Sequence, residues 1–152
     1  MIKLIEINEN NWLQAASLKV NDDQKGFLDS ALGIIARGYV YRNYNPKVIG
    51  IAHNGTLVGL ALVKDMDEEP ACYDIQQFMI DKGYQNKGYG TQALKMILSL
   101  LEKEGKYGCA EVCVKMTDAA AIHVYEKTGF VDTGYIDDDV PDCLNLMYYF
   151  KK

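Results

Sequence analysis

Hydrophobic and polar residues alternate along some stretches of the chain and recur every three or four positions along others. Alternation predicts half-buried strands, and the longer spacing predicts helices with one buried face. The expected elements, in chain order, are a strand at 1–7, helices at 11–18 and 22–37, strands at 48–52, 56–63 and 73–80, a helix that ends at Gly105, a strand at 110–116, a short helix within 118–130, and strands at 130–136 and 143–150. This order, β-α-α-β-β-β-α-β-α-β-β, predicts an α/β fold with one mixed sheet and helices on both of its faces.

Two local patterns make sharper predictions. The dipeptide Asn54-Gly55 separates two strand-like stretches and is typical of a two-residue hairpin turn. In the strand at 73–80, strict alternation places Phe78 and Ile80 on one face and Ile75 with Met79 on the other.

The composition is that of one folded domain spanning residues 1–152. Hydrophobic residues make up 49% and charged residues 24%, which excludes a disordered chain. No apolar run approaches the roughly 18 residues of a membrane-spanning helix, and the first residues lack the features of a signal peptide, so we expect a cytoplasmic protein without a membrane partner. The net charge of −5 argues against a nucleic-acid partner.

Acidic residues cluster in two runs, at 65–69 and 132–142. One interpretation is a pair of solvated loops that keep the protein in solution. The other is a negative funnel that attracts a polycationic substrate. The sequence leaves both open.

The cysteines do not suggest a metal site. Their positions, Cys72, Cys109, Cys113 and Cys143, match no zinc pattern, so no metal is expected. Each lies in or beside a strand-like stretch, where a reduced cysteine behaves as a small buried hydrophobe. His53 is expected in a loop and His123 on the exposed side of a helix.

A glycine-rich segment at 85–90 precedes the helix that ends at Gly105. Its two glycines allow a tight turn that presents free N–H groups at a helix start, where phosphate binds. A P-loop is excluded because Tyr89 stands where the lysine must be. A dinucleotide fingerprint is disfavoured because the polar stretch 81–87 separates the glycines from the strand. An ordinary glycine-rich helix cap stays open.

The same segment resembles the pyrophosphate loop, Gln/Arg-x-x-Gly-x-Gly, of the GCN5-related N-acetyltransferases, which bind acetyl-CoA. Further along, the segment 118–130 resembles this superfamily's second signature, N-x-x-A-x-x-x-Y-x-x-x-G-F. The two signatures stand in the right order, and the resemblance covers residues 50–150 well. It implies the superfamily's fold, acetyl-CoA as co-substrate without a metal, and a small-molecule amine as acceptor.

Two short segments narrow the resemblance. Residues 20–24, followed by Phe27 and Ser30, and residues 77–81 are similar to segments of bacterial spermine/spermidine acetyltransferases. They imply a polyamine acceptor. Acetylation of another amine (a protein N-terminus, an aminoglycoside or a small metabolite) and a non-catalytic acetyl-CoA-binding module are the alternatives, and a homodimer stays open.

The resemblance also assigns site residues. Those expected to contact the cofactor are Met79, Ile80, Asp81, Gln85, Asn86, Lys87, Gly88, Tyr89, Gly90, Thr91, Asp118, Ala121 and Tyr125. In the superfamily, the strand before the loop splays from the next one, and the pantetheine arm lies along it. A main-chain N–H near Met79 would then polarise the thioester carbonyl. Tyr125 matches the tyrosine that protonates the leaving thiolate, the alternative being a core tyrosine.

Deprotonation of the acceptor needs help. A lysine-like amine has a pKa near 10.4, so its neutral form costs about 4–5 kcal/mol at pH 7. Animal polyamine enzymes carry a Glu base where this chain has Gln76, which cannot accept a proton. We expect Asp74, two residues earlier, to act as the base through a water. Asp118 stands where the superfamily often has Asn, and it loses the amide donor.

Overall fold

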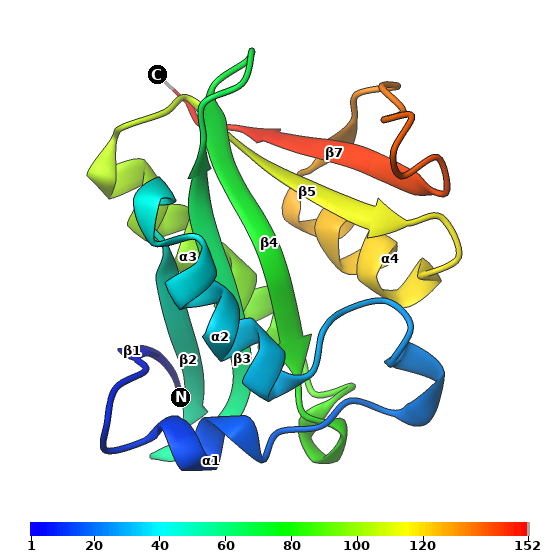
Figure 1. Cartoon of the computed structure of the whole chain (residues 1–152). Coiled ribbons are helices and arrows are strands. Elements are labelled where there is room, and N and C mark those ends of the chain that lie inside the picture. Colours follow the sequence, from blue (N-terminus) through cyan, green and yellow to red (C-terminus); the bar gives the residue numbers. More distant parts are fainter. Residues whose placement is uncertain (152) are drawn as a thin grey trace.

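The computed structural model describes residues 1–151, and its main elements follow the order expected from the sequence (Figure 1). The strands are β1 Ile2–Glu6, β2 Lys47–His53, β3 Thr56–Met66, β4 Cys72–Ile80, β5 Cys109–Lys115, β6 Val131–Asp132 and β7 Cys143–Tyr149. The helices are α1 Trp12–Ala16, α2 Ala31–Val40, α3 Tyr89–Glu104 and α4 Ala119–Thr128, with short 3-10 turns at Asp22–Gln24, Arg42–Tyr44 and Lys82–Tyr84. The expected mixed α/β architecture is therefore confirmed.

The seven strands form one sheet in the order β1-β2-β3-β4-β5-β7-β6. Within the described residues, β4 and β5 are the one parallel pair, and their ladder joins Tyr73 to Ala110 and Asp74 to Glu111. Beyond these residues the two strands diverge, as Figure 1 shows. The sheet therefore opens into a V between its N-terminal and C-terminal halves.

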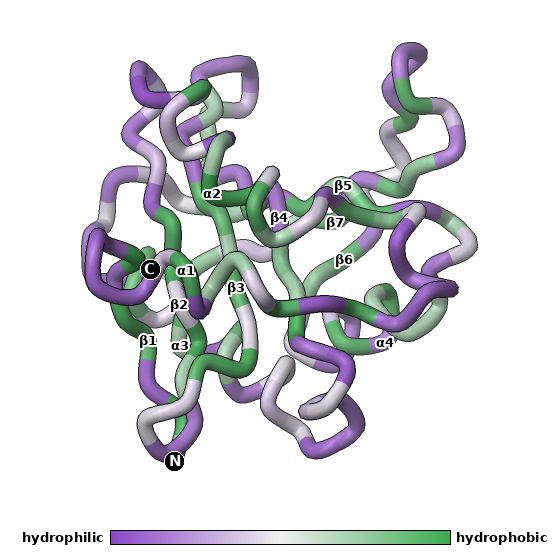
Figure 2. Tube along the Cα trace, turned by 60° about the horizontal axis from the view of Figure 1, so that its bottom comes forward, coloured by the Kyte–Doolittle hydropathy of each residue, from purple (hydrophilic) through white to green (hydrophobic). Residues whose placement is uncertain are grey.

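Helices cover both faces of the sheet. The helices α3 and α4 pack on one face, where Leu94, Ile97 and Leu101 meet Val112 and Leu146 in the largest hydrophobic cluster. The helices α1 and α2 pack on the opposite face of β3 and β4. Figure 2 shows hydrophobic stretches along the central strands and hydrophilic loops around them. These two cores fix the position of the V-shaped opening.

The hairpin between β2 and β3 forms at the predicted turn. Asn54 and Gly55 have φ angles of 50° and 84°, which suit the left-handed conformation that this turn requires. The hairpin prediction is confirmed.

The prediction of one helix at 22–37 is wrong. Residues Asp22–Gln24 form only a 3-10 turn, and α2 begins at Ala31, where the Ser30 side chain accepts a hydrogen bond from the Gly33 N–H at 3.1 Å. A serine cap satisfies one of the free donors of a helix start, so the helix begins there. Likewise, the strand expected at 130–136 is only the two-residue β6. Residues 25–30 therefore remain available to line a cavity.

A β-bulge in β4 overturns the strict alternation expected for that strand. Leu62 of β3 pairs with Gln77, whereas Val63 pairs with Ile75, so Gln76 is an extra residue in the ladder. Ile75 consequently packs in the core beneath α3, on the same side as Phe78 rather than with Met79. Because of the bulge, the residues after Gln76 lie on the opposite face from the one that unbroken alternation from the start of β4 would give them.

All four cysteines are free thiols. Cys72, Cys109 and Cys143 are buried free thiols as expected, and burial raises the pKa of Cys72 to about 12, but Cys113 is exposed, which corrects the prediction for that residue. Residues 1–151 contain no group of three His, Cys, Asp or Glu side chains that could hold a metal ion. None of the helices in this range has the length and apolar character needed to cross a membrane.

Candidate active site

An unpaired strand edge forms one wall of the candidate site. Past Asp74, the edge of β4 that faces β5 has no ladder partner among residues 1–151. The Asp81 N–H donates to the Val58 carbonyl at 2.7 Å, and Met79 lies two residues earlier in the same antiparallel register, opposite Leu60. Because N–H directions alternate along a strand, the Met79 N–H also points toward β3. The N–H groups of Phe78 and Ile80, rather than that of Met79, therefore face the open edge.

The start of α3 forms the second wall. Gly88 precedes the helix with φ 82° and ψ 1°, and no side chain among residues 1–151 caps it. Within the described chain, the N–H groups of Tyr89, Gly90 and Thr91 have no hydrogen-bond partner. Free donors at the positive end of a helix dipole bind anions. This local structure fits a phosphate group.

Gly90 brings this helix start close to the strand. A Cβ atom at Gly90 would lie 3.6 Å from Ile80 Cγ1 and 3.8 Å from Phe78 Cε1. The free N–H groups of α3 and the open edge of β4 are thus neighbours.

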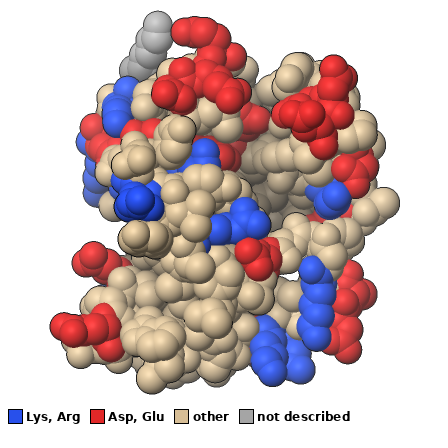
Figure 3. Space-filling model, in the orientation of Figure 1, with Lys and Arg blue, Asp and Glu red and all other residues tan. Residues whose placement is uncertain are grey.

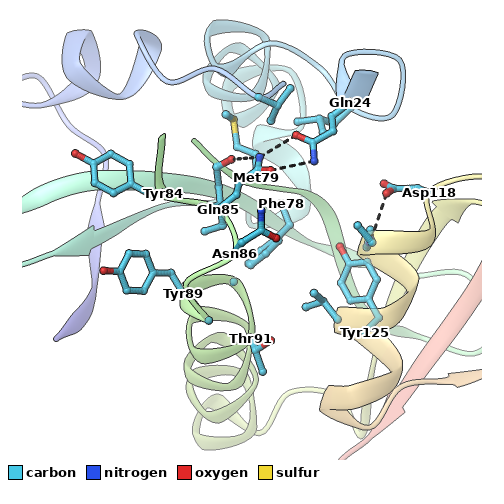
Figure 4. A pocket seen from close by; sticks show the side chains of 18 residues that line it. Gln24, Phe78, Met79, Tyr84, Gln85, Asn86, Tyr89, Thr91, Asp118 and Tyr125 are labelled. Carbon is cyan, nitrogen blue, oxygen red and sulfur yellow. Dashed lines mark hydrogen bonds between the residues drawn. The ribbon is translucent and has the colours of Figure 1, made fainter. Parts of the chain in front are cut away.

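A cavity of about 240 Å³ joins the open edge, the helix start and α4 (Figure 4). Its lining residues are Val20, Gln24, Leu28, Phe78, Met79, Ile80, Tyr84, Gln85, Asn86, Gly88, Tyr89, Gly90, Thr91, Asp118, Ala120, Ala121, Val124 and Tyr125. Most residues expected to contact a cofactor therefore line one space. Asp74, Asp81 and Lys87 are not part of the lining.

Tyr125 projects from α4 toward this cavity, as Figure 4 shows. Its ring packs against Phe130 with the centroids 5.4 Å apart, and only 8% of the residue is exposed. Burial raises the pKa of its phenol above 10, and the Asp118 carboxylate raises it further. The hydroxyl therefore keeps its proton at neutral pH and can act as an acid.

Asp118 shapes the start of α4. Its Oδ1 accepts a hydrogen bond from the Ala121 N–H at 3.2 Å, so it caps the helix. Burial raises the pKa of the carboxyl group. One carboxylate oxygen of Asp118 is thus used to cap α4, and the residue also lines the cavity.

The side chains of Asp81 and Gln85 are occupied by other parts of the chain. Asp81 accepts hydrogen bonds from the N–H groups of Lys19, at 2.8 Å, and Gly83, at 3.0 Å. The Gln85 amide bonds to Gln24 and to the Ile80 carbonyl. Asp81 therefore holds the loop in shape rather than facing the cavity, and Gln85 is left to offer mainly its backbone.

Asp74 lies in an ion pair outside the cavity lining. Its Oδ2 is 3.2 Å from Lys64 Nζ, and both side chains are nearly buried. Burial raises the pKa of Asp74, and the Lys64 ammonium opposes this effect. The geometry thus does not support the role of base that the sequence suggested for Asp74.

A second acidic residue lies beside Asp74. Glu111 stands next to it in the β4–β5 ladder and forms no ion pair within the described residues. Burial raises the pKa of Glu111, as do the charges of Asp74, Glu68 and Asp137. The last two come from the acidic runs at 65–69 and 132–142, and Figure 3 shows acidic clusters on either side of a hollow in the surface. Carboxylates from both acidic runs therefore act on Glu111.

The sequence did not assign the segment 20–28 or Phe78 to the site. Val20, Gln24 and Leu28 enter the cavity lining from the connection between α1 and α2. The only signal for them was the similarity of residues 20–24 to polyamine acetyltransferases. Phe78 could not be selected because its N–H direction depends on the pairing of β4 with β3.

These features match one family of enzymes. The Acetyltransferase (GNAT) family matches residues 10–130. The chain therefore belongs to the GNAT family of N-acetyltransferases.

Individual relatives are distant. The chain is 26% identical to a probable spermine N(1)-acetyltransferase of Bacillus subtilis subsp. natto (strain BEST195) over 143 residues, 90% of this chain and 91% of the relative. The crystal structure of the aminoglycoside acetyltransferase AAC(6')-Ib with coenzyme A superposes with a TM-score of 0.80 at 18% identity, over 98% and 95% of the two chains. Spermidine N-acetyltransferase from Vibrio cholerae with CoA and spermine gives 0.75 at 16% identity, over 97% and 95%. The two structures support the fold alone.

Proposed function

We propose that the cavity binds acetyl-CoA and that the protein transfers its acetyl group to a primary amine of a polyamine such as spermidine or spermine. The observation that carries this proposal is the convergence of three groups on one cavity: an uncapped helix start, an unpaired strand edge and a buried phenol. The free N–H groups of residues 89–91 fit a diphosphate, and the open edge of β4 fits an amide-containing arm that adds like a strand. When bound, acetyl-CoA supplies an activated acetyl thioester.

The chain's own groups then have distinct tasks. The N–H groups of Tyr89, Gly90 and Thr91 hold the negative charge of the cofactor. An N–H at the open edge, from Phe78 or Ile80, stabilises the charge that develops on the acyl oxygen. Tyr125 donates its proton from Oη to the leaving sulfur, because a phenol with a raised pKa is fully protonated at pH 7.

The carboxylates on and beside the sheet favour a polycationic acceptor. Glu111 is a half-buried carboxylate without an ion-pair partner in residues 1–151, and further carboxylates flank the hollow. A charge in such surroundings is stabilised by a cation, and clefts of one sign concentrate ligands of the other. The names of the curated relatives, spermine and spermidine acetyltransferases, agree with this acceptor.

A thiol-release assay with acetyl-CoA tests the proposal. The panel is spermidine, spermine, an aminoglycoside, and short peptides with a free N-terminus. We expect turnover with the two polyamines at lower KM than with the others. Turnover with aminoglycosides or peptides alone would identify another amine acetyltransferase, and acetyl-CoA binding without turnover would identify a non-catalytic module. A cytoplasmic location, a single domain and a homodimer stay predictions.

A further inference from the structure

The connection between α1 and α2 is fastened to the loop that follows β4. The Lys19 N–H donates to Asp81 Oδ1 at 2.8 Å, and the Lys82 N–H donates to the Lys19 carbonyl at 2.7 Å. These bonds join two segments separated by more than 60 residues. They place residues 19–24 directly against the approach to the glycine-rich loop.

A reciprocal pair of side-chain amides extends this attachment. Gln85 Nε2 donates to Gln24 Oε1 at 2.8 Å, and Gln24 Nε2 donates to Gln85 Oε1 at 3.1 Å (Figure 4). Asn21 Nδ2 also donates to Gln85 Oε1, at 3.1 Å, and Gln85 Nε2 donates to the Ile80 carbonyl, at 2.9 Å. One glutamine thus ties the end of β4, the glycine-rich loop and the segment 21–24 together.

The tied segment forms a wall of the cavity. Val20, Gln24 and Leu28 line it from the side of the α1–α2 connection, whereas residues 88–91 line it from α3. Between Asn21 and Ser30 the chain has only one 3-10 turn of its own. With so little regular structure, the position of this wall depends on its long-range hydrogen bonds. Gln24 contributes two of them, beside those of Lys19, Asn21 and Asp29.

We propose that Gln24 is a positioning residue that couples occupation of the glycine-rich loop to the order of the acceptor-side wall. The proposal rests on the proposed function, in which residues 88–91 bind the diphosphate of acetyl-CoA. A ligand that fixes the loop also fixes Gln85, and through Gln24 it fixes Val20 and Leu28. Thermodynamic reciprocity then requires the acceptor to tighten cofactor binding by the same factor that the cofactor tightens acceptor binding.

Hydrogen exchange with and without coenzyme A tests the coupling without an acceptor. In the wild-type protein, we expect coenzyme A to slow exchange both at 85–92 and at 19–28. In Gln24→Met, which has similar length but no amide, we expect full slowing at 85–92 and much less slowing at 19–28, where the bonds of Lys19 and Asn21 remain. Gln24→Glu keeps the oxygen that accepts from Gln85 and should retain protection at 19–28. Gln14→Met, at an exposed position on α1, is the matched control and should behave as wild type.

The outcomes separate the two proposals. Protection of 85–92 without any effect at 19–28 in the wild-type protein would overturn the coupling and leave cofactor binding intact. Protection at 19–28 that stays at the wild-type level in Gln24→Met would overturn the role of Gln24. No protection at either segment would overturn the proposed function itself.

A binding measurement adds the second half of the cycle. By calorimetry, we expect saturating spermidine to tighten the binding of coenzyme A about tenfold in the wild-type protein, the scale of two hydrogen bonds. In Gln24→Met this tightening should fall to about threefold or less, while the Kd for coenzyme A alone stays within about twofold of wild type. Equal tightening in the two proteins would contradict the proposal. A glutamine with a purely structural role would leave the effect of spermidine on coenzyme A binding unchanged when it is replaced.

Discussion

Asp118 caps the helix that carries Tyr125, and its carboxylate adds to the burial that raises the pKa of the Tyr125 phenol. Both residues line the cavity, and burial acts on the phenol in the same direction as the charge. Burial and this charge together keep the Tyr125 phenol protonated at neutral pH. In the proposed reaction, this proton passes to the departing thiolate.

The first prediction concerns this proton. Replacing Tyr125 by Phe keeps the ring and its contact with Phe130 but removes the acid. We expect kcat to fall about 100-fold, the usual scale for a lost general acid, with little change in the thermal melting temperature. Steady-state thiol-release kinetics and calorimetric melts measure the two effects.

The control for this variant is Tyr149→Phe, at an exposed tyrosine of β7. It should retain wild-type kcat. A Tyr125→Phe protein with activity within about threefold of wild type would remove the residue from the chemistry, since general acids contribute far more. Because the pKa of Tyr125 lies above 10, its ionisation should not lower kcat at any pH below 10.

The second prediction concerns the turn before α3. Gly88 has a φ of 82°, where an alanine is strained by about 1–2 kcal/mol, although no atom lies within 4 Å of its missing Cβ. We expect Gly88→Ala to raise the Kd for coenzyme A about tenfold, because the loop relieves the strain by moving its free N–H groups. Calorimetry measures the Kd. Gly108→Ala, which has an equally open surrounding and no positive φ, should bind as wild type.

The third prediction concerns the acceptor. Replacing Glu111 by Gln removes one half-buried negative charge with little change in shape. We expect the KM for spermidine to rise about tenfold, the scale of a lost bond to a charged group, while the KM for acetyl-CoA stays within about twofold. Glu9→Gln, at an exposed site near α1, is the control. An unchanged KM for spermidine would show that the Glu111 carboxylate does not bind the acceptor.

The fourth prediction concerns Asp74 and pH. Burial raises its folded-state pKa above the ordinary value of 3.8, so the folded protein holds this proton more tightly than the unfolded chain. The free energy of unfolding should therefore decrease as the pH rises from 3.8 through the folded-state pKa. Asp74→Asn removes this contribution, and its free energy of unfolding should fall less steeply over that window. Urea denaturation at a series of pH values gives both slopes.

The same variant tests the role expected from the sequence. If Asp74 were the base, Asp74→Asn would displace the acidic limb of the profile of kcat/KM against pH. Since the carboxylate lies in an ion pair outside the cavity lining, we expect the limb to remain where it is in the wild-type protein.

Local patterns predicted much of the fold and of the cofactor loop. The order of the elements, the Asn54-Gly55 hairpin and the glycine-rich turn before α3 were all found, because each depends on neighbours in the chain. The prediction failed where residues distant in sequence decide the structure. The bulge at Gln76 comes from the pairing of β4 with β3. The helix predicted to begin at residue 22 begins only at Ala31, so residues 25–30 lie outside it.

The sequence by itself determined that a mixed sheet would present a glycine-hinged helix start and a tyrosine seven residues after Asp118, since periodicity and glycine conformations are properties of short segments. Only the tertiary structure decided which N–H groups of β4 face the open edge, that Asp74 is paired with Lys64, and that Gln24 reaches Gln85. These relationships depend on strand register and on the meeting of segments far apart in the chain, which no local pattern specifies.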